Sequence, residues 1–201
     1  MLQWPGNNLL QWKPVNSLWT RLILPLLLMM NPSPLPAGYY DTDLLTIFAK
    51  ILPRVVTMSS LNPGENAPIS VCIVHEDIDT PAAESFEALL VHSHMKRGNH
   101  PPLRSVRTDF STLSACAQSQ LIFFFEAQPD TVAKALDTAG HFRAIIAAYD
   151  TALLDRGADV GLYVGRSVMP YINIRSLQDK HITLDTLLLR VSKIYEQSGD
   201  R

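Results

Sequence analysis

The stretch Ile69-Ser70-Val71-Cys72-Ile73-Val74 decides the fold, because it is short, apolar and rich in β-branched residues. A run of this kind is typical of a strand buried on both faces of a parallel sheet. Leu121-Ile122-Phe123-Phe124-Phe125 has the same character, and its length and aromatic content predict a second central strand.

Helical patterns lie on either side of these strands. Apolar residues recur at helical spacing from a cap at Asp41 or Thr42 to Val55, and Pro53 is expected to kink or shorten that helix. Thr80-Pro81 begins a second helix, because proline is favoured in a first turn. A third opens at Asp130, and a last one is predicted from Leu184 to Glu196. Four apolar side chains of that last helix are expected to be buried: Leu187, Leu188, Val191 and Ile194.

Further strands complete the pattern. We expect a half-buried or edge strand over 103–109, a strand over 143–148, and a hairpin of 160–165 with 169–174. Strands that alternate with helices imply crossover connections and a largely parallel sheet. The predicted fold is a single-domain α/β three-layer sandwich, with a mostly parallel sheet and an antiparallel C-terminal edge hairpin.

The first 37 residues differ from the rest. They contain no Asp or Glu, and Lys13 and Arg21 are their charged residues. The apolar run 22–30 is too short to span a bilayer but suits the hydrophobic region of a signal peptide. We predict a signal peptide over 1–37, cleaved after Ala37, an α/β domain over 38–201, and a periplasmic protein that does not itself span the membrane. The alternatives are a membrane-surface anchor or a buried helix that stays attached.

Composition and motifs exclude several function classes. The net charge is −2 and no long Lys/Arg run is present, which argues against nucleic-acid binding. The first strand ends in His75-Glu76-Asp77 rather than in a glycine-rich phosphate loop. The sequence also has neither a Gly-x-Ser-x-Gly elbow nor a His-Glu-x-x-His helix. We therefore expect no catalytic residues, no cofactor and no metal.

The histidines of the segment 92–100 invite a metal hypothesis. His92 and His94 are two residues apart, so they point to different faces of a helix, and His100 follows a break. We favour a solvated helix end, where the helix dipole stabilises basic side chains.

Polar residues follow the predicted parallel strands. His75 and Asp77 come after the first strand, Glu126 after the central one, and Asp150 after the strand over 143–148. Ligands of such sheets bind beyond the carboxyl ends of the strands, so these residues are candidates for contact with a ligand or partner. The alternative is ordinary loop polarity and helix capping.

The two cysteines have two interpretations. Cys72 lies in a strand and Cys116 precedes the next apolar strand. In an oxidising compartment they form a disulfide; otherwise they are two small buried hydrophobic residues.

Several of these segments together resemble one family. They are 48–52, 71–74, 113–116, 161–165, Ile172-Asn173-Ile174 and the leucine-rich tail 187–191. In this order they are similar to the YfiR-like (DUF4154) regulators of the bacterial periplasm, of which this chain would be a divergent member. The resemblance implies a Cys72–Cys116 disulfide and a homodimer, and it places Asn173 on the family's Ile-Asn strand as a further candidate contact.

The resemblance also implies a function. It predicts a non-enzymatic regulator that binds the periplasmic part of an inner-membrane signalling enzyme, a diguanylate cyclase or sensor kinase, and represses it. Cyclic-di-GMP signalling and biofilm formation would then depend on the bound state. The alternative is a periplasmic small-solute-binding protein that delivers its ligand to a transporter or sensor. An acid-dependent hydrolase at the strand ends is a third hypothesis.

Overall fold

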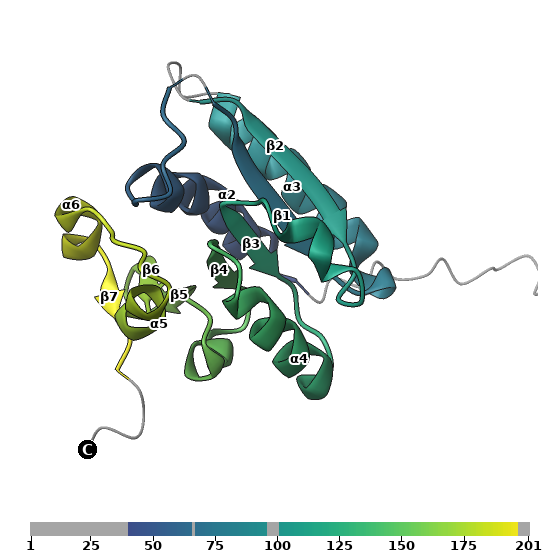
Figure 1. The fold of residues 1–201 in the computed structure, drawn as a ribbon. Coiled ribbons are helices and arrows are strands. Elements are labelled where there is room, and N and C mark those ends of the chain that lie inside the picture. Colours follow the sequence, from purple (N-terminus) through teal and green to yellow (C-terminus); the bar gives the residue numbers. More distant parts are fainter. Residues whose placement is uncertain (1–39, 66, 96–100, 197–201) are drawn as a thin grey trace, which may run out of the picture. The chain divides into compact units, whose positions relative to one another are not determined.

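The computed structural model describes residues 40–65, 67–95 and 101–196 (Figure 1). The chain divides into two units, Met1–Tyr39 and Tyr40–Arg201. All described helices and strands belong to the second unit. The predicted signal peptide and His100 lie outside the described residues.

A seven-stranded sheet organises this unit, with the strand order β2-β1-β3-β4-β5-β6-β7. Its neighbouring strands are parallel except β5 and β6, which form the predicted antiparallel hairpin. The two-residue β7 extends the sheet beyond this hairpin. The strands are β1 (Ile69–Val74), β2 (Leu103–Thr108), β3 (Leu121–Phe124), β4 (Ile145–Ala148), β5 (Val160–Val164), β6 (Val168–Ile172) and β7 (Lys193–Ile194).

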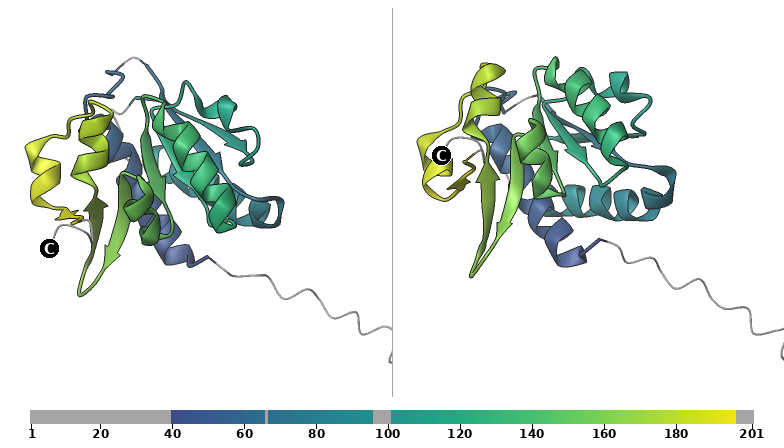
Figure 2. Two further views of the ribbon diagram at one scale, coloured as in Figure 1. Left: turned by 60° about the horizontal axis from the view of Figure 1, so that its bottom comes forward. Right: turned by 90° about the horizontal axis from the view of Figure 1, so that it is seen from below.

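Helices cover both faces of the sheet, as Figures 1 and 2 show. On one face, Val71 and Ile73 join the core formed with α2 (Thr42–Thr57) and α3 (Thr80–Met95). On the other face, Cys72 and Val74 join the core formed with α4 (Pro129–Gly140) and the short helices η2 (Leu113–Cys116) and η3 (Thr151–Arg156). Alternate strand residues thus feed two separate cores, and the predicted α/β sandwich is confirmed.

Helix α2 begins where the sequence predicts. The Asp41 carboxylate accepts hydrogen bonds from the amides of Asp43 and Leu44, at 2.8 and 3.4 Å, which caps the first turn. The helix continues through Pro53 to Thr57, so Pro53 does not shorten it. Phe48 carries the helix onto the sheet, with its ring centroid 5.0 Å from that of Phe123.

The C-terminal part differs from the prediction. A single helix from Leu184 to Glu196 is wrong: the chain forms α5 (Ile174–Asp179), α6 (Thr186–Arg190) and β7 instead. Asp185 caps α6 by accepting the Leu187 amide, at 2.7 Å. Beyond the helix, Lys193 pairs in register with Tyr171. The leucine spacing therefore reflects one short helical turn and not a long amphipathic helix.

The burial predicted for this segment fails for the same reason. Leu188 is buried, but Leu187 is 62% exposed, Val191 64% and Ile194 38%. In Figure 2 these C-terminal elements gather at one edge of the sheet. Within the described residues we find no helix with the length and apolarity needed to cross a membrane.

Candidate functional site

The carboxyl ends of β1 and β3, the second and third strands of the sheet, lie side by side. From β1 the chain runs outward to β2, and it then passes back over β1 to β3. Such a reversal leaves a crevice beyond the carboxyl ends of β1 and β3. His75 follows β1 directly, and Glu126 follows β3 after one further residue.

A pocket of about 380 Å³ lies at this edge of the sheet. It falls in the size range of small-molecule sites. The loops after β1 and β2 and the first turn of α4 supply its lining residues: His75, Glu76, Asp77, Asp109, Phe110, Ser111 and Thr131. The structure thus brings two of the predicted contact residues, His75 and Asp77, to one pocket.

His75 is held rigidly in the wall of this pocket. Its side chain is 8% exposed, and its backbone amide donates to the Thr108 carbonyl of the neighbouring strand, at 3.1 Å. Nδ1 lies 2.8 Å from the Glu76 carbonyl oxygen. A carbonyl oxygen can only accept, so Nδ1 carries a proton; in the neutral form of the ring, Nε2 is then the acceptor.

The loop after β2 forms the opposite wall. One oxygen of the Asp109 carboxylate accepts from the amide of Ser111, at 2.6 Å, and from that of Thr112, at 3.0 Å. These bonds hold the pKa of Asp109 below its usual range, with the Ser111 hydroxyl as the largest cause. Phe110 packs edge-on against Phe124 at 5.6 Å. The wall therefore combines a fixed negative charge with a supported aromatic ring.

Glu126 lies beside a separate group of tyrosines. Its backbone amide donates to the Tyr40 hydroxyl at 3.2 Å, and the Asp41 amide donates to the Tyr149 hydroxyl at 2.9 Å. The Tyr40 ring is nearly perpendicular to the Tyr149 ring, at 4.9 Å. This group fixes the start of the domain to the carboxyl edge, and Glu126 does not line the pocket next to His75.

Burial dominates the electrostatics of the two tyrosines. It raises the pKa of Tyr40, and the charge of Asp79, which accepts a hydrogen bond from the Tyr40 hydroxyl, raises it further. The pKa of Tyr149 is raised mainly by burial as well. Both phenols therefore lose their protons at a higher pH than an exposed tyrosine does.

The other two predicted contacts have structural roles. Asp150 caps η3 by accepting the Ala152 amide at 2.8 Å, which agrees with the capping alternative. Asn173 caps α5 by accepting the Ser176 amide at 3.1 Å, and its side-chain nitrogen donates to the Leu154 carbonyl at 2.9 Å. Because β6 is antiparallel, Asn173 lies beside the start of β5 and not at the carboxyl edge.

Of the two histidines of α3, His92 is exposed and His94 is buried. His94 is 9% exposed, and its Nε2 contacts the carbonyl oxygen of Pro101. The expected solvated helix end is therefore wrong for His94, which ties α3 to the start of β2. Among the described residues, no three metal-binding side chains come close enough to hold an ion.

The two cysteines are bonded to each other. The disulfide joins Cys72 of β1 to Cys116 of η2, with the Cα atoms 5.4 Å apart and the residues 44 positions apart in sequence. Both residues are fully buried in the core shared with α4. The disulfide thus fixes the crossover from β2 to β3 against β1.

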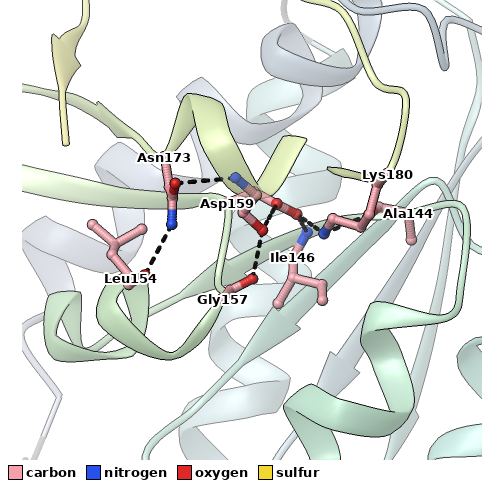
Figure 3. A network of polar contacts seen from close by, with 8 residues as sticks. Ala144, Ile146, Leu154, Gly157, Asp159, Asn173 and Lys180 are labelled. Atoms are coloured by element: carbon pink, nitrogen blue, oxygen red, sulfur yellow. Dashed lines mark hydrogen bonds and ion pairs between the residues drawn. The ribbon is translucent and has the colours of Figure 1, made fainter. Parts of the chain in front are cut away.

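Sequence reasoning missed a buried ion pair between Asp159 and Lys180 (Figure 3). Asp159 is 0% exposed. Its carboxylate accepts the Ile146 amide at 2.6 Å and the Ser176 hydroxyl at 2.7 Å, while Lys180 also donates to the Ala144 carbonyl at 3.3 Å. Burial raises the pKa of Asp159, and the Lys180 charge and the hydrogen-bond donors lower it.

The signal for this pair was weak in the sequence. The two residues lie 21 positions apart, and each reads as an ordinary surface charge. Asp159 precedes a strand in a Gly-Ala-Asp turn, and an acid so close to an apolar strand was the clue that could have found it.

The C-terminal elements present an apolar surface. A groove of about 190 Å³ lies between α5 and α6. Leu187 lies in α6 and Val191 follows its last residue; they are four residues apart and are both more than 60% exposed. The groove is lined by Ile174, Leu177, Gln178, Ile182, Thr183, Leu184 and Leu189. We call the exposed pair and this groove the C-terminal apolar surface.

Comparisons with known proteins give information about the fold alone. No family model and no curated protein matches the chain. The ABC domain from Streptococcus pneumonia in complex with L-Trp is similar, with a TM-score of 0.50, 12% identity, and coverage of 73% of this chain and 60% of that one. A conserved domain protein from Vibrio cholerae O1 biovar El Tor gives a TM-score of 0.51, 16% identity, and coverage of 76% and 60%.

These two structures share the class of architecture, an α/β sandwich around a mostly parallel sheet. The chain spans 60% of the length of each of them. At such identities the likeness concerns the arrangement of helices and strands, and function must be argued from residues.

Proposed function

We propose that this chain is an exported, non-enzymatic regulatory domain. In this proposal it binds the periplasmic part of an inner-membrane signalling enzyme, a diguanylate cyclase or a sensor kinase, and holds that enzyme inactive. The resemblance of segments 71–74, 161–165 and 172–174 to YfiR-like regulators motivates it. The buried Cys72–Cys116 disulfide is compatible with an oxidising compartment.

The C-terminal apolar surface is the observation that carries the proposal. Large apolar side chains that stay exposed together often mark a protein interaction site. Leu187 and Val191 point away from the core while Leu188, between them, fills it. In this proposal the exposed pair inserts into the signalling enzyme, and the groove between α5 and α6 accepts apolar side chains in return.

Co-purification tests this function. The tagged protein is expressed together with a membrane diguanylate cyclase or histidine kinase encoded beside its gene, and the complex is isolated in detergent. We expect a stable complex and a lowered output of the enzyme. The double variant Leu187→Glu/Val191→Glu should lose the complex, since charge at an apolar contact is costly to desolvate.

Ile78→Glu is the matched control, because Ile78 is also an exposed apolar residue, at 78%, but lies after β1. It should bind and repress as the wild type does. Equal binding by the double variant and the control would refute the role of the C-terminal apolar surface. A wild-type protein that leaves the enzyme's output unchanged would refute the regulatory function.

A second candidate function is the binding of a small solute. Two observations favour it: the pocket next to His75, and the similar fold of a protein solved with L-Trp. A saturable rise in melting temperature with a small molecule, in protein that binds no membrane enzyme, would favour this function over the first.

A further inference from the structure

We infer that the pocket beside His75 is a binding site for a small organic cation, with a primary ammonium group as the recognised part. The inference deepens the second candidate function and rests on it. It names the site and the chemical class of the ligand.

The buried imidazole is the first step of the argument. His75 is 8% exposed and lines the pocket. Its Nδ1 is used by the Glu76 carbonyl, and Nε2 has no hydrogen-bond partner among the described residues. Within that part of the chain, no fully buried side-chain nitrogen or oxygen lacks a partner. Nε2 is therefore open to the pocket, where the neutral imidazole offers a lone pair to an N–H donor.

The charge around the pocket is the second step. Glu76, Asp77 and Asp109 carry carboxylates there, and no Lys or Arg is among its lining residues. The amino end of α4 adds only a fractional positive charge, which Asp130 in the first turn offsets. A cation is therefore favoured over an anion at this site.

The lining of the pocket suits an organic cation better than a metal ion. In the described ranges, no three carboxylate or imidazole groups are close enough together to coordinate an ion. The pocket also has an apolar wall, Phe110, which is supported by Phe124. A cation placed near an aromatic face gains attraction to the ring. The hydroxyl groups of Ser111 and Thr131 add further acceptors for N–H donors.

Three probes of similar shape but different charge test these features of the pocket. Benzylamine carries the ammonium group, benzyl alcohol is neutral, and benzoate is an anion. We expect benzylamine to raise the melting temperature in a saturable way and to shift the NMR signals of His75 and Phe110. The ¹⁵N shifts of His75 should show the Nδ1–H tautomer in the free protein. Benzyl alcohol and benzoate should leave these signals unchanged.

Asp77→Asn tests the site itself. Asp77 is exposed, so the variant should fold normally. We expect it to bind benzylamine about tenfold more weakly, the loss of one charge-assisted contact. The matched control is Asp137→Asn on α4, an exposed acid outside the pocket, which should bind as the wild type does.

The outcomes separate the site from the function. Saturable binding of benzylamine with unmoved His75 signals, or equal affinity in both variants, would overturn the site and leave solute binding standing. Binding of benzoate in preference to benzylamine would overturn the ligand class. No binding of any of the three probes would overturn the inference as a whole.

Discussion

At the residue scale, the fully buried carboxylate of Asp159 matters most for the fold. Its carboxylate takes the Ile146 amide, a donor that a strand neighbour would ordinarily satisfy through its carbonyl oxygen. Lys180 from α5's end balances the charge. Charges buried in this way are tolerated only when paired and hydrogen-bonded. The ion pair therefore contributes more to the position of the C-terminal part on the sheet than to the net free energy of unfolding.

Removal of the cation should be costly. We expect Lys180→Met to lower the free energy of unfolding by about 3–5 kcal/mol, because it leaves Asp159 buried and unpaired. Lys134→Met, at an exposed position of α4, should change it by less than about 0.5 kcal/mol. Urea unfolding measures both variants. A Lys180→Met protein as stable as the control would contradict a charged pair at this position.

Tyr40 should make stability depend on alkaline pH. Its pKa is raised in the folded state, whereas in the unfolded chain it is about 10. Above that pH the unfolded state loses a proton that the folded state keeps. The contribution is thus complete below pH 10 and is lost above it, by up to about 1.4 kcal/mol per pH unit.

Tyr40→Phe removes this group and should flatten the dependence. Urea midpoints measured between pH 9 and pH 11 for both proteins give the comparison. Parallel curves would show that Tyr40 does not titrate differently in the two states.

At the scale of elements, the sequence predicted the buried parts best. The strand 69–74 was predicted with its observed bounds, since continuous β-branched runs have few other uses. The edge position of the strand over 103–109 was also correct. The last helix failed because leucine spacing alone cannot tell a buried turn from an exposed one. Leu187 and Val191 match the helical period but face solvent.

For the candidate site, too, the sequence predicted some of the residues and missed others. The strand-end argument placed His75 and Asp77 together because both follow one parallel strand. Asp150, which the same argument proposed, caps η3. Asn173, which the family resemblance proposed, caps α5 after the antiparallel strand β6. The loop after β2, with Asp109 and Phe110, was missed because its approach to β1 is set by tertiary packing.

The disulfide is the next prediction at this scale. It closes a loop across a separation of 44 residues, which corresponds to about 4 kcal/mol of stabilisation in the chain-entropy model. We expect a reductant to lower the urea midpoint of the wild type accordingly. The variant Cys72→Ala/Cys116→Ala should not respond to the reductant. An equal response of both proteins would mean that the reductant acts elsewhere.

At the scale of the whole molecule, export has a simple optical signature. The three tryptophans, Trp4, Trp12 and Trp19, all lie within residues 1–37. If the predicted signal peptide is removed after Ala37, the mature protein contains no tryptophan. Protein purified from the periplasm should then lack emission on excitation at about 295 nm, and its intact mass should correspond to residues 38–201. Tryptophan emission from that material would contradict cleavage at this position.

The sparse pairing between β4 and β5 predicts the order in which parts of the domain unfold. The two strands share a single pair in register, Ala147 with Val160, whereas β1 and β2 share six. Beyond that pair, Asp159 joins the two strands through its amide, which donates to the Ile146 carbonyl at 2.8 Å, and through its carboxylate, which accepts the Ile146 amide. Elements joined so sparingly tend to unfold as a unit of their own. In native-state hydrogen exchange, the amides of β5 and β6 should lose protection together, while those of β1 and β3 remain closed until global unfolding.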